Sequence, residues 1–133
     1  MMDAFLVPEK TTVTAKGDGP ILELQAAEER VFLLTLAITN IIEQESLDVS
    51  IHGSSDGAAW NPKPIVAFPQ KFYREESPLL LDLTARPEVK FIRAHWEVAR
   101  WGRGTETPMF EFHVMLREVP REILVEAAGR VRA

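Results

Sequence analysis

The fold is decided by the stretch Phe110-Glu-Phe-His-Val-Met-Leu-Arg117, in which every second residue is a large apolar one. Successive side chains of a β-strand point to opposite faces, so this period of two predicts a strand with one buried face. The same alternation recurs at two earlier places, first at Leu47, Val49 and Ile51, and then at Ile92, Ala94, Trp96 and Val98. Three long strands with one apolar face each indicate an all-β protein.

The run Val31 to Ile42 is apolar on both faces and contains β-branched residues. This composition favours a central strand, with a helix as the alternative. Shorter strand candidates lie at Thr11 to Lys16, Ile21 to Gln25, Ile65 to Phe68 and Leu79 to Leu83. Together they give about seven or eight strands, the number typical of β-sandwiches.

Turn signals separate these candidates. Gly17-Asp18-Gly19-Pro20 would join the first two strands, Ser54-Ser55-Asp56-Gly57 follows the Leu47 strand, and Gly102-Arg103-Gly104 lies between the last two long strands. Residues 120–130 fit either a short helix opened by Pro120 or a further strand. We therefore predict an antiparallel two-sheet β-sandwich of jelly-roll type, with a short C-terminal helix as an optional addition.

Composition bounds the class of protein. The 133 residues suit a single domain over 1–133, and 46% hydrophobic with 26% charged residues is ordinary for a globular chain. The net charge of -5 argues against nucleic acid as a partner, because sequence-independent nucleic-acid binding needs clustered Lys and Arg. Cysteine is absent, which removes disulfides and thiolate chemistry.

No targeting segment is expected. The N-terminus lacks a basic region, and its apolar run Ala4 to Val7 is too short for a signal peptide. The longest apolar stretch, Val31 to Ile42, is well short of the roughly 20 residues that span a bilayer as a helix. We expect no membrane association and, by default, a cytoplasmic location.

Two segments resemble a known family. Leu47-Asp-Val-Ser-Ile-His-Gly-Ser-Ser-Asp-Gly-Ala-Ala-Trp60 is similar to the strand, Ser-x-Asp-Gly turn and tryptophan of discoidin-type, galactose-binding-like sandwiches. Val89-Lys-Phe-Ile-Arg-Ala-His-Trp96 resembles a later strand of the same domains, which precedes a final hairpin. The resemblance implies a jelly-roll sandwich whose relatives bind glycans, lipids or proteins through loops at one end.

The three histidines suggest one metal hypothesis. His52, His95 and His113 all lie on strand faces opposite the apolar ones. If the last two long strands form a hairpin with Trp96 opposite Phe112, then His95 faces His113 and Glu97 faces Glu111. Facing side chains have Cβ atoms about 5 Å apart, close enough for a shared metal.

Two alternatives to a metal stay open for this face. A register shift of two residues would set His95 against Glu111 as a plain hydrogen bond. The face could also be a polar solvated surface or a subunit interface. We expect no bound cofactor.

A second hypothesis concerns ligand binding by loops. Trp101 and Arg103 combine an aromatic ring with a guanidinium at a flexible turn, which suits stacking on a sugar ring or gripping a carboxylate. Tyr73 lies in a second loop that is expected to be exposed. The alternative for Trp101 is a hydrophobic plug, and Trp60 and Trp96 are predicted to be core residues.

No catalytic residues are identified. Gly53-Ser54-Ser55-Asp56-Gly57 matches the Gly-x-Ser-x-Gly nucleophile elbow, but Pro62 and Pro64 exclude the helix that an elbow requires. Because Asp-Gly is favoured in tight turns, we interpret this segment as a surface turn. Enzyme activity has no support in the sequence.

The sequence therefore favours a non-catalytic binding or assembly module that contacts another protein or its own copies through a sheet face or end loops. Ala4 to Val7 and Ile123 to Val125 could cover edge strands, within the chain or across a subunit boundary. The alternative is carbohydrate or small-molecule binding through Trp101, Arg103 and Tyr73. A metal-dependent enzyme that uses His95, His113 and Glu111 or Glu97 is the third possibility.

Overall fold

The computed structural model describes residues 2–24, 30–41, 45–71, 73–100, 109–120 and 123. Within these ranges the chain forms nine strands. They are β1 (Asp3–Val13), β2 (Gly17–Asp18), β3 (Leu22–Glu23), β4 (Val31–Ile41), β5 (Glu45–Ser54), β6 (Val66–Ala67), β7 (Glu76–Asp82), β8 (Phe91–Arg100) and β9 (Phe110–Glu118).

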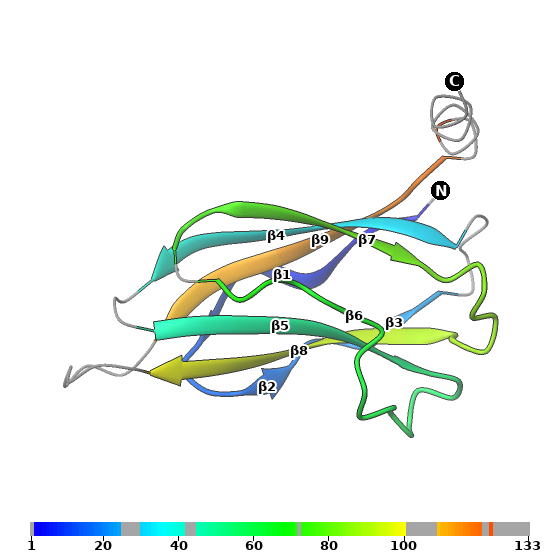
Figure 1. Cartoon of the computed structure of the whole chain (residues 1–133), viewed down its shortest axis with the longest axis horizontal. Helices are drawn as coiled ribbons and strands as arrows, with labels where there is room; N and C mark the ends of the chain where they lie inside the picture. The colour runs from blue at the N-terminus through cyan, green and yellow to red at the C-terminus, as the bar shows by residue number, and fades with distance from the viewer. Residues whose placement is uncertain are drawn as a thin grey trace.

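The strands form two antiparallel sheets packed face to face, as Figure 1 shows. The four-stranded sheet has the order β1-β9-β4-β7. The five-stranded sheet has the order β2-β8-β5-β6, and β3 pairs with β8 beside β2. The predicted all-β, two-sheet sandwich is confirmed.

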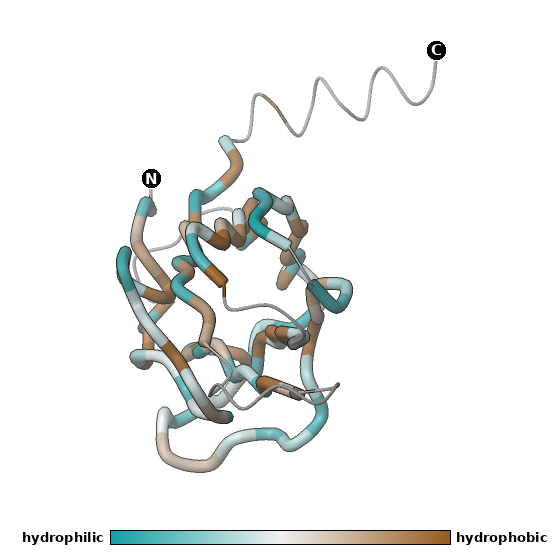
Figure 2. The backbone as a smooth tube through the Cα atoms, turned by 90° about the vertical axis from the view of Figure 1, so that its left-hand side faces the viewer, coloured by the Kyte–Doolittle hydropathy of each residue, from teal (hydrophilic) through white to brown (hydrophobic). Residues whose placement is uncertain are grey.

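The core lies between the sheets and is built by alternate residues of the long strands. In β9, Phe110 and Phe112 point inward and are fully buried, and so is Phe32 of β4, which lies opposite Glu118 at the other end of β9. Trp96 of β8 meets Phe112 across the core, edge to face, with ring centroids 5.5 Å apart. Figure 2, which looks along the strands, shows the two layers on either side of this core.

Most predicted strands are confirmed, with differences at their ends. The strand predicted over Val31 to Ile42 is confirmed as β4 (Val31–Ile41), which lies between β9 and β7, and Ile42 lies outside the described residues. The first strand begins eight residues earlier than predicted, because the N-terminal Ala4 to Val7 segment is itself paired with β9 as part of the edge strand β1. Gly17–Asp18 was predicted to be a turn but forms the short strand β2, paired with β8.

The predicted hairpin between the last two long strands is wrong. β8 pairs with β5 in one sheet, whereas β9 pairs with β1 and β4 in the other. Alternation defines which face of a strand is buried but not which strand lies beside it, and it is equally satisfied when the chain crosses from one sheet to the other. Trp96 and Phe112 are therefore neighbours across the core and not within a sheet.

Two further expectations fall partly outside the described residues. The Gly102-Arg103-Gly104 turn lies outside them, and of residues 120–130 only Pro120 and Ile123 are described, with Ile123 helical. In the described part of the chain, no helix has the length and apolar character needed to cross a bilayer.

Candidate functional site

The outward face of the five-stranded sheet gathers polar side chains around His95. Cross-strand pairing places Ser50 of β5 on one side of His95 and Asp18 of β2 on the other. Nδ1 of His95 lies 2.9 Å from Oδ1 of Asp18. Because a carboxylate can only accept, we assign the proton of this hydrogen bond to Nδ1. Oε1 of Glu97 lies 3.6 Å from the other ring nitrogen, Nε2.

His52 joins this face from β5. Its Nδ1 lies 2.9 Å from the carbonyl oxygen of Asn61, which assigns the proton to Nδ1, and its Nε2 lies 3.0 Å from Oγ of Ser50. The His52 and His95 rings meet edge to face with centroids 5.7 Å apart. The β5–β8 register, which the sequence does not reveal, brings these two histidines together.

Arg93 lies directly opposite His52 in the β5–β8 register and stacks on Trp60. Its Cζ is 4.4 Å from the centroid of the Trp60 ring, a cation–π contact. Nε of Arg93 is buried, has no hydrogen-bond partner in the described part of the chain and lies 3.7 Å from Oδ1 of Asp18. That distance is too long for a hydrogen bond, so the pairing of Arg93 with Asp18 is electrostatic.

The position of Trp60 differs from the one predicted. It was expected in the core, but it is only partly buried and packs outside the five-stranded sheet. The residue follows the turn after β5, where no strand alternation directs its side chain inward. Trp96, in contrast, is buried as predicted.

These side chains line a shallow pocket of about 330 Å³, which we call the outer pocket. Its lining residues are Asp18, His52, Trp60, Asn61, Pro62, Arg93 and His95. The pocket therefore combines one carboxylate, one guanidinium and two imidazoles with an apolar wall formed by Trp60 and Pro62.

The contact between Ser50 and His52 resembles the pairing of a nucleophile with a base. Acyl transfer also needs hydrogen-bond donors aimed at a developing oxyanion. Ser50 lies within β5, between β8 and β6, so the backbone amides around it are committed to the sheet. We conclude that this contact helps to orient the His52 ring, whose tautomer is set by the carbonyl oxygen of Asn61.

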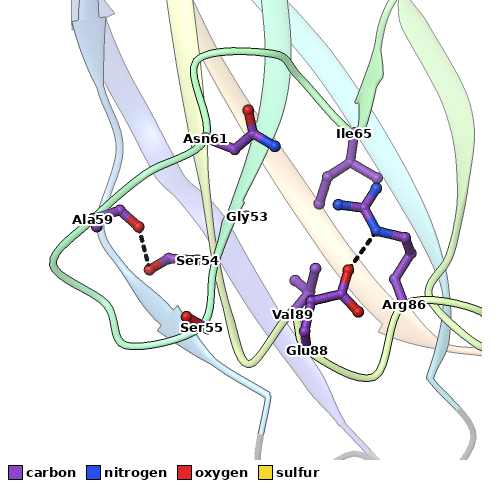
Figure 3. Close-up of a pocket in the computed structure, with 9 residues that line it drawn as sticks. All are labelled: Gly53, Ser54, Ser55, Ala59, Asn61, Ile65, Arg86, Glu88 and Val89. Atoms are coloured by element: carbon purple, nitrogen blue, oxygen red, sulfur yellow. Dashed lines mark hydrogen bonds and ion pairs between the residues drawn. The ribbon is translucent and has the colours of Figure 1, made fainter.

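A second, smaller hollow of about 190 Å³ lies at the end of the sandwich, beside the Gly53 to Gly57 motif (Figure 3). Oγ of the buried Ser54 lies 2.6 Å from the carbonyl oxygen of Ala59 and accepts the amide of Gly57 at 2.9 Å. Gly57 has a positive φ of 78°, which favours glycine. These contacts close a turn, as predicted. Ser55, the central serine of the motif, is exposed.

On the far side of this hollow, Arg86 and Glu88 form an ion pair of 2.7 Å, also drawn in Figure 3. The hydrogen bond from Arg86 holds the pKa of Glu88 below its usual value. Gly53 forms the floor, where a Cβ would come within 2.7 Å of Cδ1 of Ile65. This hollow therefore lies where the turn after β5 packs against the segment between β7 and β8.

The structure does not bring the four predicted metal ligands together. His95 and Glu97 lie on the outer face of the five-stranded sheet, whereas His113 and Glu111 lie on the outer face of the four-stranded sheet. His113 packs edge to face on Phe5 at 5.8 Å, and Glu111 accepts a hydrogen bond from the Thr39 hydroxyl at 2.9 Å. Among the described residues, no group of three or more His, Asp or Glu is placed to hold a metal ion.

Around His113, the outer face of the four-stranded sheet carries exposed apolar side chains. One cross-strand row is Phe5, Met115, Thr35 and Pro78, and the next contains Leu33 beside Leu80. Phe5, Leu33 and Leu80 are 42%, 40% and 57% exposed. We call these six residues the apolar face. Asp3 and Arg117 form an ion pair of 3.4 Å in the Leu33 row.

The predicted loop site is only partly described. Trp101 and Arg103 lie outside the described residues. Tyr73, between β6 and β7, is 73% exposed and does not line either pocket.

Comparison with protein-family models, with curated proteins and with solved structures finds no match for this chain. The discoidin-type resemblance therefore stays a prediction.

Proposed function

We propose that this chain is an assembly module that pairs with a second copy of itself through the apolar face. The observation that carries the proposal is the exposure of Phe5, Leu33 and Leu80 on the outer face of one sheet, on β1, β4 and β7. An antiparallel sheet with one solvated face normally carries polar residues there. A contiguous exposed apolar patch, in contrast, marks an interaction surface.

The size of the sheet suits a pair of identical chains. The four strands are 11, 9, 11 and 7 residues long, and at roughly 3.3 Å per residue and about 4.8 Å between strands they present roughly 600 Å². A stable interface buries about 800 Å² per partner, so the sheet supplies about three quarters of that area by itself.

The charges on this sheet also suit a symmetric pair. Asp3 and Arg117 lie side by side, so a two-fold axis through the face can place each carboxylate near the partner's guanidinium. A surface with one acid and one base in the same row is self-complementary in this arrangement.

We also infer that the sandwich is a jelly roll. The order of the strands supports this: each sheet takes strands alternately from the two ends of the chain, β1 beside β9 and β2 with β3 beside β8. The remaining strands follow the same rule, with β4 beside β7 in the first sheet and β5 beside β6 in the second. Nested pairing of this kind is that of two Greek keys folded into two sheets.

Sedimentation velocity on three proteins tests the assembly proposal. The native chain is expected to sediment as a dimer at micromolar concentration. Leu80→Asp places a carboxylate in the contact, and we expect it to weaken the dimer at least about tenfold, since a buried unpaired charge costs more than 1.4 kcal/mol. Ile21→Asp is the matched control, because Ile21 is 52% exposed beside the other sheet, and it should remain a dimer.

Circular dichroism and the urea midpoint confirm that each variant is folded. A monomeric native chain would overturn the proposal, including the case in which the chain binds only a different protein. A Leu80→Asp variant that dimerises as tightly as the native chain would overturn it as well.

A further inference from the structure

The outer pocket presents opposite charges on neighbouring strands. Asp18 projects from β2 and Arg93 from β8, with Oδ1 and Nε 3.7 Å apart. With both imidazoles neutral, the lining residues carry one positive and one negative charge. A simple anion would be repelled by Asp18, and a simple cation by Arg93. The complementary ligand carries both charges and is neutral overall.

Arg93 is held ready to bind a carboxylate. Stacking on Trp60 fixes the plane of the guanidinium, and fixed planar guanidinium groups bind carboxylates through paired hydrogen bonds. Its contact with Asp18 is too long to be a hydrogen bond, and its buried Nε has no hydrogen-bond partner among the described residues. Buried donors are normally satisfied, so the Nε–H of this guanidinium lacks an acceptor among the described residues.

Asp18 is held ready to accept a second donor. Oδ1 accepts the hydrogen bond from Nδ1 of His95, which fixes the position of the carboxylate on the sheet. A carboxylate has two oxygens and about four acceptor positions, so one imidazole does not saturate it. An ammonium group forms a charge-assisted hydrogen bond with a carboxylate, roughly twice as strong as a hydrogen bond between neutral groups.

The remaining wall of the pocket is apolar. Trp60 and Pro62 border the charged pair, and the volume of about 330 Å³ is at the small end of the range for ligand sites. We propose that the outer pocket binds a free α-amino acid with an apolar side chain. Arg93 takes the carboxylate, Asp18 takes the ammonium, and the side chain packs on Trp60 and Pro62.

Calorimetric titration with matched probes tests this site. Phenylalanine, leucine and methionine represent the ligand class. Phenethylamine lacks only the carboxylate of phenylalanine, and 3-phenylpropionate lacks only its ammonium. We expect saturable binding of at least one amino acid and at least about tenfold weaker binding of both truncated probes to the native chain. Galactose, a neutral polyol, should not bind.

Variants assign the binding to the pocket. Asp18→Asn keeps the shape of the side chain and should weaken amino-acid binding at least about tenfold, as should Arg93→Gln. Asp48→Asn changes a carboxylate on the same face that does not line the pocket and is hydrogen-bonded to Gln70, and it should bind like the native chain. Near-UV circular dichroism checks that Arg93→Gln leaves the tryptophan environment folded.

Three results would overturn the proposal: no binding of any of the three amino acids, equal binding of a truncated probe, or tighter binding of galactose. The test is separate from the assembly proposal, because the outer pocket and the apolar face lie on opposite sheets. Leu80→Asp should therefore bind the amino acid like the native chain, whatever its oligomeric state.

Discussion

Asp56, together with Ser54, organises the turn that follows β5. Its Oδ1 accepts the amides of Ala58 and Ala59, both at 2.9 Å, and lies 3.0 Å from the hydroxyl of Ser54. These hydrogen bonds hold the pKa of Asp56 below its ordinary value of 3.8. The amide of Ala59 lowers the pKa most, followed by the amide of Ala58 and the Ser54 hydroxyl. Hydrogen bonds to a carboxylate favour its charged form.

We predict that Asp56→Asn is less stable than the native chain at pH 7. A carboxyl whose pKa is lowered by folding stabilises the protein above its unfolded pKa, and this stability is lost as the pH falls through the lower folded value. The difference in unfolding free energy between the native chain and Asp56→Asn should therefore become smaller below about pH 3.8, the ordinary pKa of this carboxyl. Urea midpoints measured against pH check this.

Ser55→Ala is the control for that series, because Ser55 is an exposed neighbour in the same turn. Its urea midpoint should equal that of the native chain at every pH. A difference between Asp56→Asn and the native chain that does not change with pH would show that the charge of Asp56 is irrelevant to the turn.

The surroundings of some residues can be predicted from the sequence, and those of others cannot. The Asp56-Gly57 turn was predictable, because its hydrogen bonds span at most five residues and need only local chemistry. Trp60 was not, since its burial depends on Arg93 of another strand. The meeting of His52 and His95 depends on the β5–β8 register, for which no turn between the strands provides a local signal.

Strand identity was more predictable than strand pairing. Alternation correctly marked the buried faces of β5, β8 and β9, because it follows directly from the geometry of a strand in a two-layer protein. The same pattern could not show that β8 and β9 belong to different sheets. The two-residue strand β2 was also beyond reach, since two residues carry no period, whereas β3 and β6 lie within the strands predicted at Ile21 to Gln25 and Ile65 to Phe68.

The connections are held by specific contacts, of which Arg30 makes the most extensive set. It adopts a positive φ of 60° just before β4. Its Nη2 donates to the carbonyl oxygens of Arg86 at 2.9 Å and Val89 at 2.7 Å, and its Nε donates to that of Leu83 at 3.4 Å. One side chain thus ties the start of β4 to the segment between β7 and β8.

We predict that Arg30→Met destabilises the fold by about 1–3 kcal/mol, because partly buried carbonyl groups lose their charged donor. The urea midpoint should fall without a change in the slope of the transition. Arg74→Met, which removes an exposed arginine elsewhere, should change stability by no more than about 0.5 kcal/mol. An Arg30→Met variant as stable as the Arg74→Met control would contradict the role given to Arg30.

The molecule as a whole presents two outer faces with different chemistry. One sheet exposes apolar side chains around Phe5, Leu33 and Leu80, and the other exposes the charged and aromatic outer pocket. The sequence carried a signal for the apolar face, because a strand that is apolar on both sides must bury both of them. The outer pocket was not predictable, since its residues come from three strands and a loop.

We propose that the apolar face pairs two copies of the chain. Light scattering on untagged native protein measures the mass of the assembly directly. The protein is diluted through the micromolar range, because a dimer dissociates on dilution. We predict a mass of twice that of one chain, falling towards the monomer at the lowest concentrations. A mass equal to one chain throughout would contradict the claim and leave the exposed apolar face without a partner of its own kind.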